Sequence, residues 1–211
     1  MKIKCATVGI LGTNCYIVEK DGFSAVIDPG ENPTFIDKAI KETLKTPPSY
    51  IILTHSHFDH VGALDALHKL YPKAIIASSE YSELSTQGIK EQAKTLLGIY
   101  YNSTCYNQDS FEIPEPNLRL KDGQQLGPFK ILYTPGHTMD SLCLYSAEDS
   151  VLFSGDTLFC GSYGRTDLGG SIEDIKESLT RLLKLPPQTT VLPGHGEATT
   201  IEEEQQLLSV I

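Results

Sequence analysis

The feature that most constrains this chain is the pattern H-x-H-x-D-H at positions 55–60, directly after a strand-like apolar run. Side chains alternate along a strand, so His55 and His57 project to the same face. A helix that begins at the end of this pattern brings Asp59 and His60 back over the same point. We therefore expect four metal-ligand side chains to converge at the end of one strand.

Three further residues of ligand type also stand directly after strand-like runs. His137 and His195 each follow a Pro-Gly pair, which fixes a turn and lets the backbone approach closely. Asp156 follows the apolar run 151–153. Each is a weak signal alone, but four strand ends that all terminate in imidazole or carboxylate indicate a metal centre. His68 lies apart from this set, and we interpret it as an ordinary core or surface histidine.

The number of these groups indicates two metals. Five histidines and two aspartates exceed the four ligands of a structural zinc site, and no cysteine pair supplies thiolates. Seven such groups hold two metals about 3.5–4 Å apart when one carboxylate bridges them. Imidazole and carboxylate suit zinc, iron and manganese alike. We expect two divalent metals per chain, with zinc as the first choice and iron or manganese as alternatives.

Strand-like runs alternate with amphipathic helical segments, which indicates an α/β (α+β) chain with sheets covered by helices. The length suits a single domain over 1–211. Strands are expected at 15–18, 25–27, 50–53, 74–77, 130–133, 142–145, 151–153 and 190–192. Helices are expected over 32–44, from 59 or 60 to 70, from 171 to before 186, and from 200 to about 210.

The segment 82–120 fits this alternation least well. A helix over 87–101 precedes a polar, aromatic stretch with prolines, and a long connection inside a compact domain is usually functional or mobile. We interpret the segment as a lid or insert, with a plain surface excursion as the alternative. Its Tyr100, Tyr101 and Tyr106 are candidate substrate contacts, and simple packing is the alternative for them.

Composition and charge exclude several classes of protein. A net charge of -10 argues against nucleic-acid binding. No run of about 18 apolar residues is present to span a membrane, and the N-terminus has no signal-peptide core. The five cysteines include no C-x-x-C pair, and an odd number argues against a disulfide framework. We expect a cytoplasmic protein that acts on a small molecule, without nucleic-acid or membrane partners. The oligomeric state stays open.

The ordered set H-x-H-x-D-H, Gly-His, Asp and Gly-His over positions 55–195 resembles the metallo-β-lactamase superfamily. The resemblance implies an αβ/βα four-layer sandwich, with two mixed β-sheets flanked by helices and the metals at one edge of the sheets. It implies one metal on His55, His57 and His137, a second on Asp59, His60 and His195, and Asp156 as the bridge.

Within this superfamily, the segment 155–159 followed by Gly164-Arg165 resembles the glyoxalase II group of thioester hydrolases. The implied reaction is attack of a metal-bridging hydroxide on a hydroxyacylglutathione-like thioester, with Asp59 and Asp156 as catalytic residues. That group carries a helical domain that grips glutathione, and the sequence has only about 16 residues after His195, so glutathione recognition stays an open question. We expect Arg165 to recognise substrate, and an ion pair with Asp167 is the alternative.

A second resemblance, of Gly164-Arg165-Thr166-Asp167 to persulfide dioxygenases, implies a different reaction. It implies a single iron on His55, His137 and Asp156, and therefore an oxidoreductase. The common β-lactamases fit less well, because they carry a cysteine where Asp156 stands. A binding protein on an inactive hydrolase fold is a third alternative, which the survival of all seven ligand residues disfavours.

Overall fold

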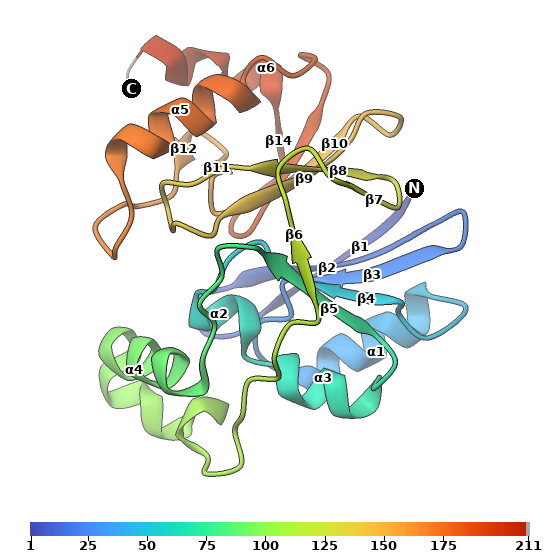
Figure 1. The fold of residues 1–211 in the computed structure, drawn as a ribbon, viewed down its shortest axis with the longest axis vertical. Coiled ribbons are helices and arrows are strands. Elements are labelled where there is room, and N and C mark those ends of the chain that lie inside the picture. The colour runs from blue at the N-terminus through green and yellow to red at the C-terminus, as the bar shows by residue number, and fades with distance from the viewer. Residues whose placement is uncertain (210–211) are drawn as a thin grey trace. The chain divides into compact units, whose positions relative to one another are not determined.

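The computed structural model describes residues 1–209, which form two compact units. Unit 1 comprises residues 1–78 and 83–118, and unit 2 comprises residues 79–82 and the chain from 119 onward. Each unit holds a six-stranded sheet and its own helices (Figure 1). The single domain expected over the whole chain stays a prediction.

The sheet of unit 1 combines antiparallel and parallel pairs. Strands β1 to β3 are antiparallel neighbours, whereas β3 pairs parallel with β4, and β4 pairs parallel with β5. The chain passes from unit 1 into unit 2 along β6. The strands lie in chain order: β1 (Lys2–Val8), β2 (Thr13–Lys20), β3 (Phe23–Ile27), β4 (Tyr50–Ile52), β5 (Ile75–Ser79) and β6 (Leu118–Leu120).

The helices of unit 1 begin where local sequence favours it. Helix α1 (Pro33–Thr43) has a proline in its first turn, and the Asn32 side chain accepts from the Phe35 N–H. The single helix expected from 59 or 60 to 70 is two short helices. The helical segments are α1, α2 (Phe58–Val61), α3 (Leu64–Leu70), α4 (Thr86–Leu97), η1 (Gly98–Ser103) and η2 (Cys105–Asn107).

Contacts from elsewhere in unit 1 explain the break between α2 and α3. A Cβ atom at Gly62 would lie 2.3 Å from the Tyr106 hydroxyl oxygen, so only glycine lets the tyrosine approach this closely. The next residue, Ala63, donates its N–H to the Pro29 carbonyl at 3.0 Å. The helical pattern of 59–70 gives no sign of either Tyr106 or Pro29, so the break could not be predicted from it.

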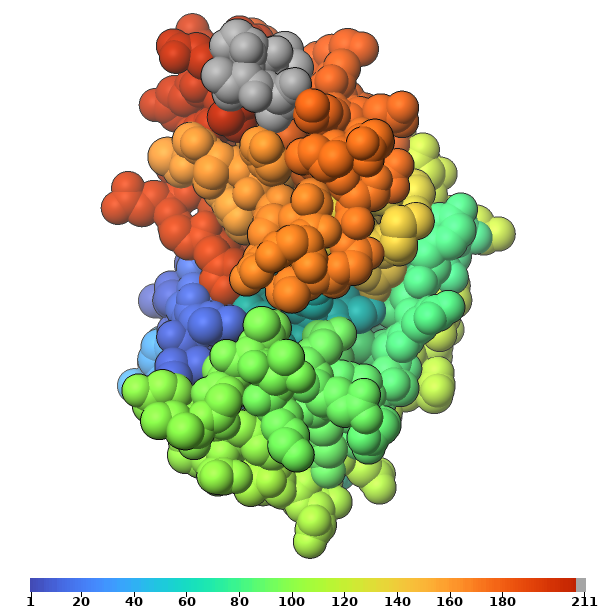
Figure 2. All heavy atoms as spheres, turned by 90° about the vertical axis from the view of Figure 1, so that its left-hand side faces the viewer, coloured from blue at the N-terminus to red at the C-terminus, as the bar shows by residue number. Residues whose placement is uncertain are grey.

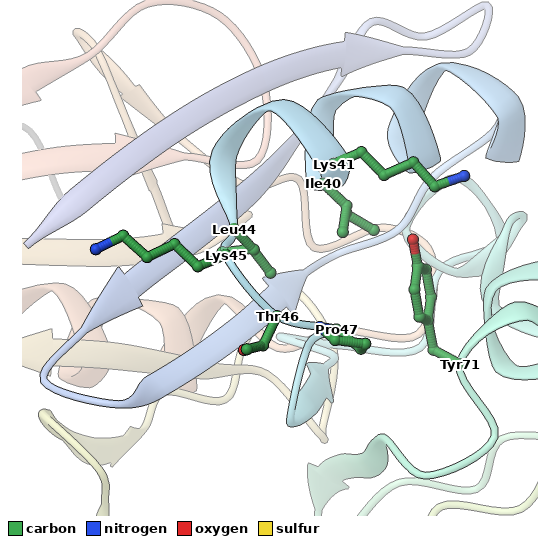
Figure 3. A pocket seen from close by; sticks show the side chains of 7 residues that line it. All are labelled: Ile40, Lys41, Leu44, Lys45, Thr46, Pro47 and Tyr71. Atoms are coloured by element: carbon green, nitrogen blue, oxygen red, sulfur yellow. The ribbon is translucent and has the colours of Figure 1, made fainter.

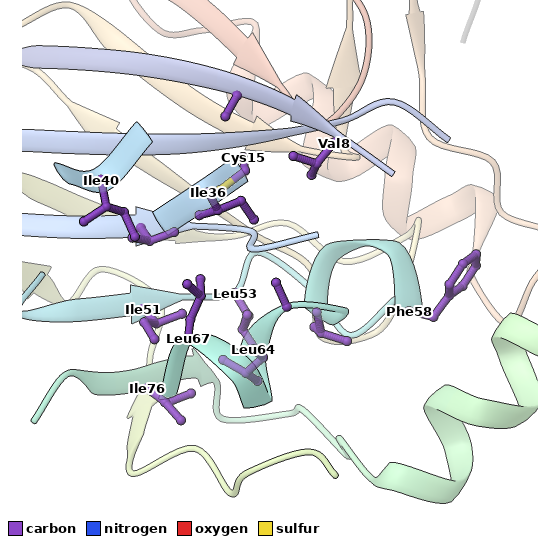
Figure 4. Close-up of a cluster of buried hydrophobic side chains, with 14 of the residues drawn as sticks. Val8, Cys15, Ile36, Ile40, Ile51, Leu53, Phe58, Leu64, Leu67 and Ile76 are labelled. Carbon is purple, nitrogen blue, oxygen red and sulfur yellow. The ribbon is translucent and has the colours of Figure 1, made fainter. Parts of the chain in front are cut away.

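One apolar cluster fills unit 1 between its sheet and its helices. Figure 4 shows side chains from the strands, among them Cys15 and Ile51, facing side chains from α1 and α3, among them Ile36 and Leu67. All of these are fully buried. Burying such side chains contributes about 1.5–3 kcal/mol each, so this cluster fixes the strands of the sheet and the helices upon them.

The segment expected as a lid is part of this core on its inner side. Ile89 and Ala93 of α4 and Tyr106 of η2 belong to the buried cluster, and the Tyr106 ring contacts Phe58 and Phe111 edge to face. Its outer side is exposed and forms the green surface in Figure 2. The predicted helix over 87–101 is confirmed up to Leu97, after which the chain tightens into the 3-10 turn η1.

Replacing Tyr106 with Phe is expected to lower the free energy of unfolding by about 1–2 kcal/mol. The buried hydroxyl donates to the Phe58 carbonyl at 2.9 Å, and the variant leaves that acceptor without this donor. Urea unfolding measures the effect. The control is Tyr100→Phe at a ring that is 57% exposed, where we expect a change within about 0.5 kcal/mol. Equal losses in the two variants would contradict this account.

Unit 2 is built around a second mixed sheet in the order β14-β13-β10-β9-β8-β7. Strands β10 and β13 are parallel neighbours, and the other pairs are antiparallel. The strands are β7 (Gln125–Leu126), β8 (Phe129–Tyr133), β9 (Leu142–Ser146), β10 (Val151–Gly155), β13 (Thr190–Pro193) and β14 (Thr199–Thr200). A separate hairpin is formed by β11 (Leu158–Phe159) and β12 (Ser162–Tyr163).

Helix α5 (Ile172–Leu182) covers the sheet of unit 2. Ser171 caps it as predicted, by accepting from the Asp174 N–H, and Leu179 packs against Leu152 and its neighbours in a second apolar cluster. The helix expected from 200 to about 210 is α6 (Ile201–Glu204) followed by η3 (Gln205–Ser209), and Val210 lies outside the described residues. Within residues 1–209, no helix is long and apolar enough to cross a membrane.

Candidate metal centre

The four predicted ligands of unit 1 follow β4, and Asp28 follows its parallel neighbour β3. Ile27 of β3 pairs with Ile52 of β4, so Asp28 emerges beside the turn that leads to His55. The Asp28 N–H donates to the Ile52 carbonyl at 2.9 Å. The carboxyl ends of parallel strands meet at one edge, and the sheet therefore delivers both segments to the same place.

The four predicted ligands of unit 1 come together there. The His55 ring lies 4.8 Å from the His57 ring and 4.2 Å from the His60 ring, measured between centroids. His60 Nε2 lies 3.5 Å from Asp59 Oδ2. His55, Asp59 and His60 are buried, and His57 is half-buried. The predicted convergence of these side chains is confirmed within unit 1.

Asp28 and Thr54 set the tautomers of two of these imidazoles. The Thr54 hydroxyl donates to Asp28 Oδ2 at 2.7 Å, so towards His55 Nδ1, at 3.1 Å, the same hydroxyl accepts. Asp28 Oδ2 also accepts from His60 Nδ1 at 3.0 Å. Both rings thus carry their proton on Nδ1 and present Nε2, the arrangement that orients metal-binding histidines.

Two further side chains of unit 1 adjoin Asp59. The Thr13 hydroxyl donates to Asp59 Oδ2 at 2.9 Å, which fixes the orientation of this carboxylate. Burial, followed by the charge of Asp59, raises the pKa of Glu31 above its ordinary value. Glu31 and Asp59 thus place two carboxyl groups in this corner of unit 1, and a bound cation would stabilise their charged forms.

In unit 2, two predicted ligands stand at the ends of neighbouring parallel strands. Gly155 of β10 pairs with Pro193 of β13, and the Gly194 N–H donates to the Gly155 carbonyl at 2.8 Å. Asp156 and His195 therefore leave adjacent strand ends, and His195 Nε2 lies 3.5 Å from Asp156 Oδ2.

His137 completes the set in unit 2. Its Nε2 lies 3.6 Å from the same oxygen, Asp156 Oδ2. Its Nδ1 lies 2.7 Å from the Arg165 carbonyl oxygen, which accepts only, so the proton is on Nδ1 and Nε2 points to the carboxylate. His137 and Asp156 are buried.

The spacing and the protonation states fit metal ions in both sets. Two ligand atoms bound at 2.0–2.1 Å in tetrahedral geometry lie about 3.3 Å apart, and the three Nε2–Oδ2 distances are 3.5–3.6 Å. With their protons on Nδ1, neutral His60 and His137 turn Nε2 lone pairs towards these carboxylate oxygens, and a cation between the two acceptors stabilises such a pair. The donor set of nitrogen and oxygen suits zinc, iron or manganese.

The four predicted substrate-contact residues have different environments in the structure. Tyr106 is 0% exposed and packs in the core, so we correct its assignment from substrate contact to packing. The Tyr101 hydroxyl donates to the Tyr106 carbonyl at 3.2 Å, and Tyr100 is exposed. Arg165 forms a two-bond ion pair with Asp167 at 2.7 Å, the alternative named above, and its hydrogen bond lowers the pKa of Asp167 to about 2.

Sequence reasoning missed the residues that hold the ligands. Asp28 was not among the predicted site residues, although it also stands at a strand end. That position is the signal that could have identified it. Thr13, Thr54 and the Arg165 carbonyl carry no comparable signal, because their roles depend on pairing with distant residues.

A pocket of about 290 Å³ lies in unit 1 at the end of α1, and no predicted ligand lines it (Figure 3). The Tyr71 hydroxyl at its wall donates to Asp37 Oδ1 at 2.5 Å, and Lys41 donates to Asp37 Oδ2 at 2.6 Å. The lining residues are Ile40, Lys41, Leu44, Lys45, Thr46, Pro47 and Tyr71.

These contacts predict a pH-dependent contribution of Asp37 to stability. The hydrogen bonds from Lys41 and then Tyr71 lower the pKa of Asp37. A lowered pKa means that the stabilisation is present above the unfolded value of about 3.9 and is lost as the pH falls through the folded value. The difference in unfolding free energy between wild type and Asp37→Asn should therefore shrink from pH 5 towards pH 2. A constant difference over this range would contradict the prediction.

Comparison with known proteins identifies the family of the chain. The model of the metallo-beta-lactamase superfamily matches residues 8–195. Hydroxyacylglutathione hydrolase GloC of Haemophilus influenzae is 32% identical, with 98% of this chain and 96% of that protein covered.

Two solved structures agree with this match. TTHA1623 in a di-iron-bound form has a TM-score of 0.83 at 33% identity, covering 99% of this chain and 100% of that one. BLEG-1 B3 metallo-beta-lactamase has a TM-score of 0.76 at 30% identity, covering 98% and 99%. The predicted fold class, mixed sheets flanked by helices, is confirmed. The chain belongs to the metallo-beta-lactamase superfamily.

Proposed function

We propose that this protein is a metal-dependent hydrolase that cleaves an S-acyl thioester with two divalent metals per chain. The observation that carries the proposal is the geometry in both units: imidazole Nε2 atoms stand 3.5–3.6 Å from carboxylate oxygens. The similarity to a hydroxyacylglutathione hydrolase supports the thioester as substrate.

In this proposal the seven predicted ligand residues hold two metals in the way that the family resemblance implies. The ligand sets are His55, His57 and His137 for one metal, Asp59, His60 and His195 for the other, and Asp156 for both. When bound, the metals make hydroxide available near pH 7 and polarise the acyl oxygen. The protein contributes orientation: Asp28, Thr54 and the Arg165 carbonyl hold protons on Nδ1. Thr13 fixes Asp59, which with Asp156 we propose as catalytic.

A thioester matches what the residues offer. A thiolate with a conjugate-acid pKa near 8.5 leaves without much help from a general acid. We propose Arg165 as the residue that recognises a substrate carboxylate, because a guanidinium binds carboxylates in a bidentate manner. The substrate would then replace Asp167, which forms both hydrogen bonds with Arg165 in the structure. We further propose zinc as the metal, a small-molecule substrate in place of nucleic acid, and a cytoplasmic location in which the five free thiols persist.

Metal content is the first test of this proposal. Elemental analysis of protein purified without added metal or chelator should give close to two metals per chain. Mainly zinc, or zinc with iron, supports the hydrolase. A single iron favours the dioxygenase that the Gly164–Asp167 segment resembles, and no metal, with none regained on reconstitution, refutes both.

Turnover separates the remaining reactions. Lactoylglutathione and other thioesters should be hydrolysed in preference to a β-lactam, which is included because of the likeness to BLEG-1. Oxygen uptake with glutathione persulfide should be absent. Oxygen uptake without thioester hydrolysis would replace the proposed activity with an oxidation.

A further inference from the structure

A short hairpin of unit 2 adjoins all three ligands of that unit. The hairpin runs from β11 to β12, and Asp156 precedes it by two residues. After the hairpin, the Arg165 carbonyl accepts from His137 Nδ1 at 2.7 Å. The Phe159 ring stands edge to face with the His195 ring, with centroids 6.3 Å apart.

The base of the hairpin is in tight contact with two of these ligands. A Cβ atom at Gly164 would lie 1.9 Å from the Asp156 carbonyl oxygen and 2.9 Å from His137 Cβ. The chain therefore passes at a distance that only glycine allows. A hairpin that is packed this closely cannot shift at its base without moving Asp156 or His137.

The tip of the hairpin is held by a buried carboxylate from the C-terminal part of the chain. Glu204 of α6 is only 3% exposed. Its Oε2 accepts from the Gly161 N–H at 2.9 Å, and its Oε1 accepts from the Thr199 hydroxyl at 2.7 Å. A carboxylate is costly to bury without such bonds. The two bonds of Glu204 tie the hairpin tip to β14, which follows the turn that carries His195.

We propose that Glu204 is a positioning residue for the metal ligands of unit 2. By fixing the hairpin at Gly161, it holds the Arg165 carbonyl that orients His137 and the Phe159 ring that borders His195. The inference rests on the proposed function only in that His137, Asp156 and His195 bind metal. Groups that orient metal ligands typically change affinity by about 10–100-fold when removed, and we expect Glu204 to fall in this range.

The neighbouring Glu203 supplies a matched control. Its Oε2 also accepts from the Thr199 hydroxyl, at 3.0 Å, and forms the capping box of α6 with Thr200. Glu203 is exposed, however, and within residues 1–209 the Gly161 N–H donates to the carboxylate of Glu204 and not to that of Glu203. Glu203→Ala therefore perturbs the same helix and the same threonine without releasing the hairpin.

The test is a zinc titration against a chromophoric chelator, with urea unfolding of each metal-free variant beside it. Glu204→Ala should raise at least one zinc dissociation constant about 10–100-fold, and Glu204→Asp, which is shorter by one methylene, should raise it too. Glu204→Gln keeps an acceptor for Gly161 and should stay within about threefold of wild type, as should Glu203→Ala.

Two results would overturn the positioning role. One is wild-type zinc affinity in folded Glu204→Ala or Glu204→Asp, and the other is an equal loss in Glu203→Ala. If Glu204→Ala does not fold, Glu204→Asp and Glu204→Gln decide the question. Zinc binding without thioester turnover in the wild type would refute the proposed reaction and leave the role of Glu204 measurable. No zinc binding by the wild type would refute both.

Discussion

Asp156→Ala is expected to abolish hydrolysis, with a loss of at least about 10³-fold, the upper end for one preorganised electrostatic group. Two imidazole nitrogens, from His137 and His195, converge on Asp156 Oδ2 at 3.6 and 3.5 Å. Removing this carboxylate removes the one group that both share in unit 2. Metal content should fall from near two per chain to one or less, as elemental analysis will show.

The control for this variant is Asp122→Ala in the same unit. Asp122 forms an ion pair with Arg181 at 2.8 Å and is not one of the predicted metal ligands. This variant should keep the metals and the turnover of the wild type. Full thioester turnover in Asp156→Ala would refute the hydrolase mechanism, whatever its metal content.

Asp28→Ala is expected to destabilise the metal-free protein by about 3 kcal/mol, because buried donors left unpaired cost about 1–3 kcal/mol each. Asp28 accepts from the Thr54 N–H and hydroxyl, both at 2.7 Å, and from His60 Nδ1 at 3.0 Å. The zinc affinity of Asp28→Ala should also be about 10–100-fold lower than that of the wild type, because the His60 tautomer is no longer fixed.

Asp28→Asn separates the backbone from the hydrogen bonds. Asp28 has a φ of 51°, in the left-handed region that Asn tolerates better than Ala. Asn keeps one acceptor oxygen, so its loss of stability, measured by urea unfolding without metal, should be smaller than that of Ala. An Asn variant as unstable as the Ala variant would assign the effect to the three donors and not to the backbone.

The position of the predicted ligand residues at strand ends can be predicted from the sequence because it follows from local rules. A strand reverses its side chains at every residue and ends at a turn, so His55, His137, Asp156 and His195 can be placed at strand ends without any long-range information. The eight expected strands are all present for the same reason, since each is an apolar run bounded by turn residues.

What the sequence does not predict depends on pairing between distant segments. The role of Asp28 requires the parallel register of β3 and β4, and the break after α2 requires Tyr106 against Gly62. Strands of two residues, such as β11, carry no periodicity of their own. Tyr106 looks like any loop tyrosine until its contacts with Phe58 and Phe111 place it in the core.

The apolar clusters of the two units have a consequence for metal supply. Each cluster is formed by apolar side chains and includes no predicted metal ligand. Ile36 and Leu67 belong to the cluster of unit 1, and Leu152 and Leu179 belong to that of unit 2. We therefore expect folding not to require a bound metal ion, in contrast to small zinc domains, which unfold without their metal. A chelator should strip the metals and leave the chain folded and able to exchange zinc for iron. If the proposed metals bind, the metal found after purification would then depend on the metals available in the cell as well as on the preference of the ligands.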